Sequence, residues 1–138
     1  MGNNGSTSKV NFDDMKHAIG NTDYAIISTL PEQRQSCLIE GTIPAMNETV
    51  ALNEMLNRGS SKHVIIYGES AVDDSIVKKY HQITSLGFPK VSVYPGGLFE
   101  WLLLQEVYSP EEFPTTSIER DILKFKGRSA LTTRMLTY

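Results

Sequence analysis

The stretch 63-HVIIYGESAVDDSIVKKYHQI-83 contains a strand, a short loop and a helix, and it indicates the fold class of the chain. HVIIY is apolar and β-branched, as in a buried strand, and residues 74–86 repeat apolar side chains with the period of a helix. A loop that leads from a buried strand into a helix is where many enzymes hold a nucleophile or an anion. This loop, GESAVDDS, has no Cys, Arg or Lys and carries three carboxylates, Glu69, Asp73 and Asp74.

The flanking sequence continues the alternation of strands and helices. Apolar, β-branched runs predict buried strands at 24–30 and 90–94, and CLI at 37–39 predicts a short further strand. This alternation predicts an α/β domain with a mostly parallel sheet and helices on both faces. The expected helices are one with Asp13 or Asp14 near its cap and Gly20 beyond its end, 48–58 after a cap at Asn47, 74–86, and 98–108. Their predicted core-facing residues are Val50, Met55 and Leu56 in the second helix and Ile76, Val77, Tyr80 and Ile83 in the third.

The length of 138 residues suits one domain with a single core. We expect a flexible leader at 1–9, a folded domain at 10–108 and a basic C-terminal extension at 109–138. The leader is small and polar, so it cannot fold alone. The end of the extension has too little apolar content for a core of its own. Two arrangements are open for it: packing over its own acidic domain, or lying along an acidic partner.

The charge is unevenly distributed along the chain. Its formal net charge of −3 gives no general attraction to nucleic acid. Residues 119–138 carry five basic and two acidic side chains, a formal charge of +3, which leaves −6 for the other 118 residues. The basic side chains are therefore candidate contacts for a protein partner. They are Arg120, Lys124, Lys126, Arg128 and Arg134.

Cysteine content and the termini indicate the compartment. The chain has one cysteine, Cys37, which excludes an internal disulfide and favours a reducing, cytoplasmic setting. No apolar run approaches the roughly 20 residues of a membrane span. The start MGNNGS fits the pattern for N-myristoylation at Gly2, and one acyl chain would give only weak, reversible membrane binding.

Three landmarks occur in the order found in the rhodanese-like family. The segment 37-CLIEGTIPA-45 resembles the family's Gly-His-Ile-Pro-Gly-Ala turn, with Thr42 in place of His and the second Gly missing. The second landmark is the strand, loop and helix of 64-VIIYGESAVDDS-75. The third, 87-GFPKVSVYPGGLFEW-101, is the most specific. The resemblance covers roughly residues 10–108 and implies a rhodanese-like domain.

The departures from the family fall on its chemistry. The resemblance implies sulfur transfer by a cysteine at the start of the loop, and Gly68 stands at that position. The family's anion-binding Arg matches about Asp73, and its Asp-Val-Arg after the first core strand is replaced by residues 28–30, Ser-Thr-Leu. The same losses exclude the chemistry of the related cell-cycle phosphatases. The degenerate loop comprises Gly68, Glu69, Ser70, Ala71, Val72, Asp73 and Asp74.

The charges of the loop also predict that it cannot bind the family's anionic substrate. Successive backbone N–H groups and a helix start form a positive concavity for an anion, and carboxylates are their favoured side-chain partners. We expect Glu69, Asp73 and Asp74 to fill this site and repel thiosulfate, phosphate and arsenate. The sequence therefore predicts an inactive sulfurtransferase homologue that needs no cofactor and serves as a protein-interaction or structural module in an intracellular assembly.

Other chemistry is less favoured by the sequence. The alternative is a small-molecule enzyme with a non-standard nucleophile such as Cys37, although a lone Cys is more often a small buried hydrophobe. The loop carboxylates lack the spacing of a calcium loop. His17, His63 and His81 lack metal-ligand spacing, so we expect them at the surface or the edge of the core.

Overall fold

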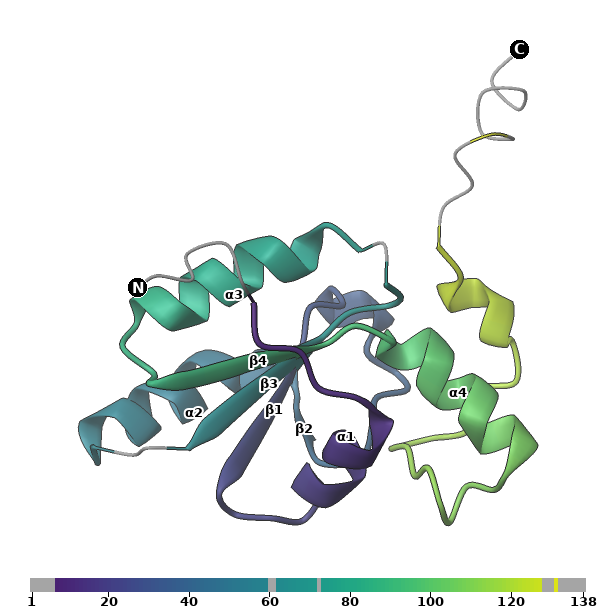
Figure 1. Cartoon of the computed structure of the whole chain (residues 1–138), viewed down its shortest axis with the longest axis horizontal. Helices are drawn as coiled ribbons and strands as arrows, with labels where there is room; N and C mark the ends of the chain where they lie inside the picture. The colour runs from purple at the N-terminus through teal and green to yellow at the C-terminus, as the bar shows by residue number, and fades with distance from the viewer. Residues whose placement is uncertain (1–6, 60–61, 72, 128–130, 132–138) are drawn as a thin grey trace.

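The computed structural model describes residues 7–59, 62–71, 73–127 and 131 of the chain (Figure 1). Strands and helices alternate in it, as expected for an α/β domain. The strands are β1 (Tyr24–Ser28), β2 (Thr42–Ile43), β3 (His63–Tyr67) and β4 (Lys90–Tyr94). The helices are α1 (Phe12–Ala18), α2 (Ala45–Asn57), α3 (Ser75–Ser85) and α4 (Gly97–Val107), with the 3-10 helices η1 (Glu32–Arg34) and η2 (Ile122–Phe125).

The strands form one parallel sheet in the order β2-β1-β3-β4. The first residues of three strands, Tyr24, His63 and Lys90, are neighbours in register. Because all strands run in the same direction, the loops after β1, β3 and β4 lie at one edge of the sheet, where ligands bind in open α/β folds. The degenerate loop that the sequence predicted at residues 68–74 therefore lies at the edge of the sheet where proteins with open α/β folds hold their ligands.

The leader extends the sheet beyond β4. The Val10 N–H donates to the Val93 carbonyl at 2.9 Å, and the Val93 N–H donates to the Ser8 carbonyl at 2.8 Å. The Ser8 hydroxyl also lies 2.8 Å from the Ser92 hydroxyl. These bonds attach the last residues of the predicted flexible leader to the domain, and they cover the edge of the sheet at β4.

Alternating side chains along the strands build a core on each face of the sheet, so the expected helices on both faces are confirmed. Figure 1 shows α3 and α1 on opposite sides of the strands. The core on the α1 and α4 side includes Met15, Ile26, Ile65, Tyr67, Trp101, Phe113 and Phe125. The core on the α2 and α3 side includes Ala25, Ile27, Leu52, Val64, Ile66 and Ile83.

Helix α2 begins earlier than predicted, and one of its predicted core residues is wrong. Its N-cap is Pro44, not Asn47, and the extended backbone of Pro44 (φ −62°, ψ 151°) leads directly into the helix. Val50 is 71% exposed, whereas Leu52 is buried. Two residues correspond to about 200° around a helix, so Val50 and Leu52 lie on opposite faces. Met55 and Leu56 pack against the core as expected.

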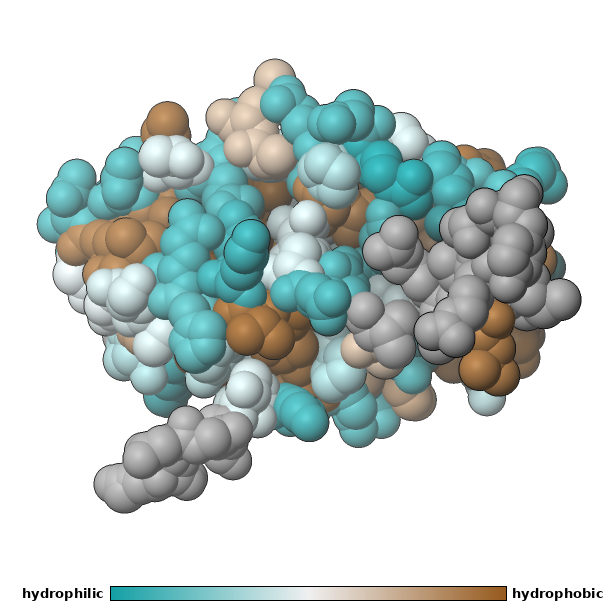
Figure 2. Space-filling model, turned by 90° about the horizontal axis from the view of Figure 1, so that it is seen from above, coloured by the Kyte–Doolittle hydropathy of each residue, from teal (hydrophilic) through white to brown (hydrophobic). Residues whose placement is uncertain are grey.

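Helix α3 differs from its prediction at one position. Ile76 and Ile83 are buried and Tyr80 packs against the core, but Val77 is 62% exposed. Spacings of four and seven residues keep Ile76, Tyr80 and Ile83 on one stripe, and Val77 is turned about 100° away from Ile76. From the side of α3, the surface combines hydrophilic residues with small hydrophobic patches (Figure 2).

The short strand β2 lies at Thr42–Ile43 rather than at the predicted 37–39. Residues 39–42 form a turn, in which the Thr42 N–H and hydroxyl donate to the Ile39 carbonyl at 3.1 and 2.6 Å. The hydroxyl of Tyr67, at the end of β3, lies 2.8 Å from the Thr42 hydroxyl and accepts from the Ile39 N–H at 3.1 Å. Because residues 39–42 form this turn, strand β2 begins only at Thr42.

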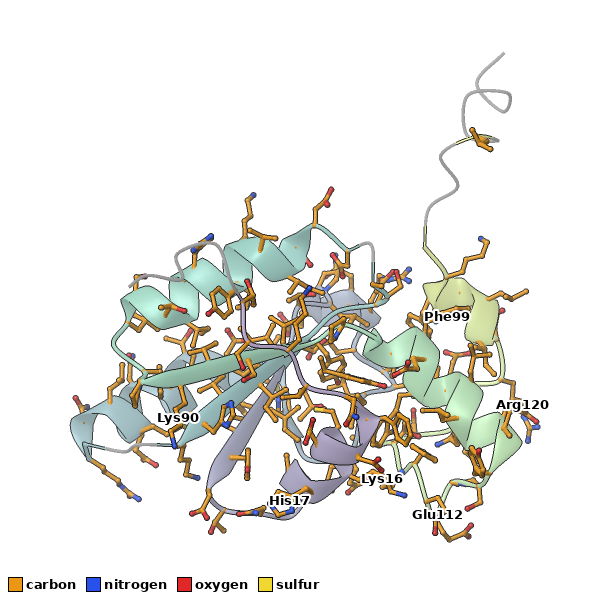
Figure 3. The ribbon with its side chains drawn as sticks, viewed as in Figure 1. Lys16, His17, Lys90, Phe99, Glu112 and Arg120 are labelled. Atoms are coloured by element: carbon orange, nitrogen blue, oxygen red, sulfur yellow. The ribbon has the colours of Figure 1, made fainter. Side chains whose placement is uncertain are left out.

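The first part of the extension belongs to the same packed unit as the domain. Phe113 and Phe125 are buried in the core beneath α1 and α4. The Trp101 indole N–H donates to the Pro114 carbonyl at 3.0 Å. Lys16 of α1 pairs with Glu112 at 2.8 Å (Figure 3). The predicted boundary at Tyr108 thus separates residues that share one core, because residues 109–125 pack on the domain. The end of the extension, for which the sequence left two arrangements open, lies outside the described residues except for Gly127 and Leu131.

The helices of the described residues are too short or too polar to cross a membrane. The predicted lipidation site Gly2 and the predicted contacts Arg128 and Arg134 lie outside those residues.

Candidate functional site

The loop after β3 is held against the start of α4. The carbonyls of Gly68 and Glu69 accept bonds from the N–H groups of Leu98 and Phe99 at 2.9 and 2.8 Å. Gly97 has a φ of +68°, and a Cβ there would lie 2.7 Å from the Gly68 carbonyl oxygen. Only glycine therefore allows this approach, which fixes the first half of the loop.

The second half of the loop folds around the carboxylate of Asp73. One oxygen accepts from the Glu69 N–H at 3.0 Å and from the Thr29 hydroxyl at 3.3 Å. The other accepts from the Ser75 N–H at 2.9 Å and its hydroxyl at 2.5 Å. These donors include two backbone N–H groups at the loop and helix start, the type of group that would hold a bound anion. The Asp73 carboxylate occupies their site.

The same carboxylate takes the space that a side chain at position 68 would need. A Cβ built on Gly68 would collide with Oδ2 of Asp73, and it would lie 2.9 Å from both Asp73 Cγ and Thr29 Oγ1. Gly68 itself is buried. The loop therefore combines the absence of a side chain at residue 68 with a carboxylate in its place.

The environment of Asp73 favours its ionised form. Partial burial would raise its pKa, but the hydrogen bonds from Ser75, Glu69 and Thr29 outweigh burial and hold the pKa below its ordinary value. The site therefore holds a negative charge at neutral pH, which disfavours a second anion.

The other loop carboxylates do not fill the site, contrary to the prediction. Glu69 turns to Arg34 of η1 and pairs with it at 2.6 Å. Asp74 is exposed and makes no capping bond to α3. The guanidinium of Arg34 also donates to the Lys124 carbonyl at 3.3 Å and lies 5.6 Å from the Phe125 ring. Arg34 therefore connects the loop to the extension.

A hollow of about 360 Å³ remains beside the loop. Its lining includes Thr29, Glu69, Asp73 and Asp74, and Lys126 of the extension borders it. Ser70 is buried and Ala71 is exposed, whereas Val72 lies outside the described residues. The three carboxylates face this hollow with one lysine, so its charge is opposite to that of an anion site.

Cys37 does not have the environment of a nucleophile. It is buried, and its thiol donates to the Ser117 carbonyl at 3.4 Å. Burial raises the pKa of the thiol above its ordinary value, which keeps it protonated at neutral pH. It does not line the hollow beside the loop.

The other residues singled out in the sequence do not gather at the loop. Lys124 pairs with Glu119 at 3.2 Å, and Arg120 is exposed on the extension (Figure 3). Within the described part of the chain, no group of three or more His, Cys, Asp or Glu could hold a metal ion. His81 is exposed, in agreement with its prediction.

A comparison with protein-family models decides the family. Residues 11–104 match the model of the rhodanese-like domain. The chain belongs to the rhodanese-like domain family. The predicted rhodanese-like α/β domain is thereby confirmed. No curated protein sequence matches the chain.

Solved structures show the same rhodanese-like fold. The BH2092 protein of Bacillus halodurans has a TM-score of 0.59 at 17% identity, over 72% of this chain and 74% of that one. An uncharacterised protein of Saccharomyces cerevisiae has a TM-score of 0.54 at 20% identity, over 73% and 95%. The single-domain sulfurtransferase RDL2 of the same yeast has a TM-score of 0.50 at 17% identity, over 75% and 94%. At these identities the likeness concerns the fold.

Proposed function

We propose that this rhodanese-like domain is catalytically silent and acts as a protein-interaction or structural module in a larger intracellular assembly. The observation that carries the proposal is the Asp73 carboxylate, which stands where a side chain at position 68 would be and accepts hydrogen bonds from the loop's own donors. Sulfur transfer needs a thiolate that attacks a sulfane sulfur and then carries it as a persulfide. Gly68 supplies no such group.

Placing a cysteine at position 68 tests whether the missing nucleophile alone would account for the proposed absence of sulfurtransferase activity. We expect the Gly68→Cys variant to show no thiosulfate:cyanide sulfurtransferase activity, because the new side chain would collide with Asp73 and the carboxylate would still repel thiosulfate. Ala71→Cys is the matched control, since it places a thiol on an exposed residue of the same loop. Turnover by Gly68→Cys above that of Ala71→Cys would contradict the proposal.

A nucleophilic Cys37 is the alternative, and the geometry does not favour it. Its thiol is buried and lies under the extension, where Ser117 accepts its hydrogen bond. An enzyme of this kind would need an accessible thiolate beside a substrate pocket. We therefore retain the non-catalytic role as the proposed function.

The proposed interaction role places a partner at the extension. Residues 109–125 pack on the domain, and Arg120 within them is exposed. Lys126 is exposed directly after them, and its N–H donates to the Leu123 carbonyl at 3.1 Å. Exposed cations of this kind suit an acidic protein surface. The ion pair between Lys124 and Glu119, which lie 3.2 Å apart, supplies an internal standard for crosslinking.

Carbodiimide crosslinking of native material, which joins lysines to carboxylates, tests the interaction role. We expect crosslinks from Lys126 to acidic residues of another protein, together with the internal link between Lys124 and Glu119. A chain that ends at Gly127 keeps the packed extension, so it separates the contribution of residues 128–138 from that of Lys126. If the only links obtained from Lys126 are internal, the proposed partner site is wrong.

A further inference from the structure

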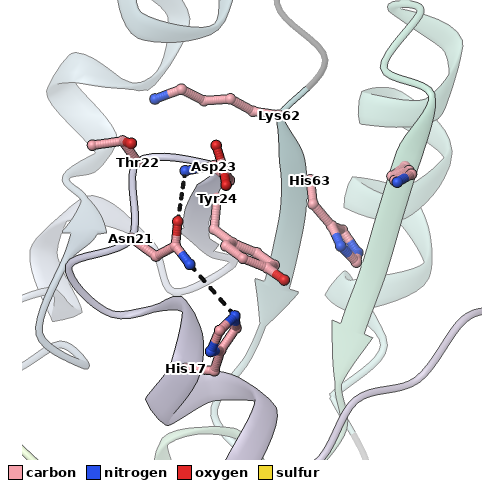
Figure 4. Close-up of a pocket in the computed structure, with 8 residues that line it drawn as sticks. His17, Asn21, Thr22, Asp23, Tyr24, Lys62 and His63 are labelled. Atoms are coloured by element: carbon pink, nitrogen blue, oxygen red, sulfur yellow. Dashed lines mark hydrogen bonds between the residues drawn. The ribbon is translucent and has the colours of Figure 1, made fainter.

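A polar cleft lies at the edge of the sheet opposite the degenerate loop, where β1, β3 and β4 begin. It measures about 530 Å³ and is lined by residues 21–24 together with His17, Lys62, His63 and Lys90 (Figure 4). Each of these eight side chains carries a polar group. The cleft is therefore suited to a small polar ligand rather than to an apolar one.

The parallel register builds one wall of the cleft. Tyr24, His63 and Lys90 are the first residues of adjacent strands and are paired in register, so their side chains lie on the same face. The rings of Tyr24 and His63 stack at 5.4 Å, and His17 of α1 meets the Tyr24 ring edge-on at 5.5 Å. The wall is a continuous row of one ammonium, two imidazoles and one phenol.

Hydrogen bonds hold several of the lining side chains in place. The Asn21 amide group lies 3.4 Å from Nε2 of His17, and its oxygen accepts from the Asp23 N–H at 2.9 Å (Figure 4). The imidazole of His63 is held 2.7 Å from the Ser92 hydroxyl. The polar groups therefore have defined positions before any ligand binds, which lowers the entropy cost of binding.

The charges of the cleft favour an anion. Lys62 and Lys90 contribute two positive charges, and Asp23 is the one carboxylate among the lining residues. Burial and the charge of Lys90 hold the pKa of His63 below its ordinary value, although Asp14 acts in the opposite direction. The lining residues carry two positive charges and one negative charge, a formal net charge of +1 with the histidines neutral. This contrasts with the acidic hollow beside the loop.

We infer that this cleft binds a phosphoryl group, with Lys62 and Lys90 supplying the charge and the Thr22 and Tyr24 hydroxyls donating hydrogen bonds. A phosphoryl group is attracted by the formal net positive charge of the lining and accepts several hydrogen bonds at once. The cleft is larger than one phosphate, which leaves room for a group esterified to it. The inference does not depend on the proposed function, because the cleft and the loop lie at opposite edges of the sheet.

Titration by nuclear magnetic resonance, at constant ionic strength with chloride as the balancing anion, tests the inference. Inorganic phosphate and O-phosphoserine are the two probes. We expect saturable shifts of the imidazole C–H signals of His17 and His63. Tighter binding of phosphoserine would assign the site to phosphate esters, and equal binding would assign it to the free anion. Absence of saturable shifts with both probes would overturn the inference.

Charge-reversal variants locate the site. The double variant Lys62→Glu/Lys90→Glu should bind at least about tenfold more weakly, since two attractive charges become repulsive. Lys78→Glu is the matched control, because Lys78 is an exposed lysine of α3 that does not line the cleft. Equal affinity of both variants would overturn the assignment. Shifts confined to the Gly68 and Glu69 amides would overturn it as well, and they would also contradict the filled loop.

Discussion

Replacing Phe125 with alanine should lower the free energy of unfolding by about 3 to 5 kcal/mol, the usual cost of removing a buried phenylalanine. Phe125 is 1% exposed and belongs to the same core as Trp101 and Phe113. Its ring also lies beneath the guanidinium of Arg34, which pairs with Glu69 of the loop. The loss should therefore affect both the core and the position of the loop.

Leu123→Ala is the matched control for Phe125→Ala. Leu123 lies on the same 3-10 helix but is 62% exposed, so its removal should change the stability by about 0.5 kcal/mol or less. Urea denaturation of both variants, followed by tryptophan fluorescence, measures the difference through Trp101. Equal midpoints for Phe125→Ala and the wild type would show that the extension is a detachable tail and not part of the domain.

Replacing Asp73 with asparagine should lower the free energy of unfolding at neutral pH by about 2 kcal/mol. An amide retains only one acceptor oxygen, so donors from Glu69 or Ser75 would face an NH₂ group. This loss lies near the lower end of the range for hydrogen bonds to charged groups, because solvent partly screens the carboxylate. Asp74→Asn is the matched control, since Asp74 is exposed and makes no capping bond.

The effect of Asp73→Asn should also depend on pH. The pKa of Asp73 is lowered in the folded state, so its contribution to stability is fully present above the unfolded value of about 3.9 and is lost as the pH falls through the folded value. The difference between wild type and variant should therefore be constant from pH 7 to about 5 and shrink below about pH 4. A difference that grows on acidification would contradict the assigned hydrogen bonds.

Local patterns in the sequence predicted the sheet well. The continuous apolar runs at β1, β3 and β4 left few alternatives to buried parallel strands, and the structure places them there. The predicted inward faces of α2 and α3 were partly wrong because Val50 and Val77 are apolar but lie off the buried stripe. An apolar residue is informative about burial only when its helical phase is known.

The extension and the surroundings of the loop could not be predicted in the same way. Phe113 and Phe125 are separated by mainly polar residues, so no periodic pattern marks them as core. The pair between Arg34 and Glu69 joins residues 35 positions apart in the chain. Such contacts depend on how the elements pack, which the spacing of residues does not encode.

The candidate site was predicted in its chemistry but not in its geometry. The sequence showed that residue 68 has no side chain and that carboxylates surround it. It did not distinguish among Glu69, Asp73 and Asp74. In the structure, it is the carboxylate of Asp73 that accepts hydrogen bonds from the backbone N–H groups of the loop. The cleft at the other edge was not predicted, because the row of Tyr24, His63 and Lys90 arises from strand register.

The proposal that this rhodanese-like domain is catalytically silent is tested most directly by the rate at which the purified wild-type chain forms thiocyanate from thiosulfate and cyanide. A sulfurtransferase with an intact cysteine loop serves as the positive control, and the Cys37→Ser variant is measured in parallel. The filled loop predicts that the wild type and the variant both stay at the rate of the buffer blank. Turnover by the wild type that rises with protein concentration would contradict the account, and its loss in Cys37→Ser would identify the nucleophile.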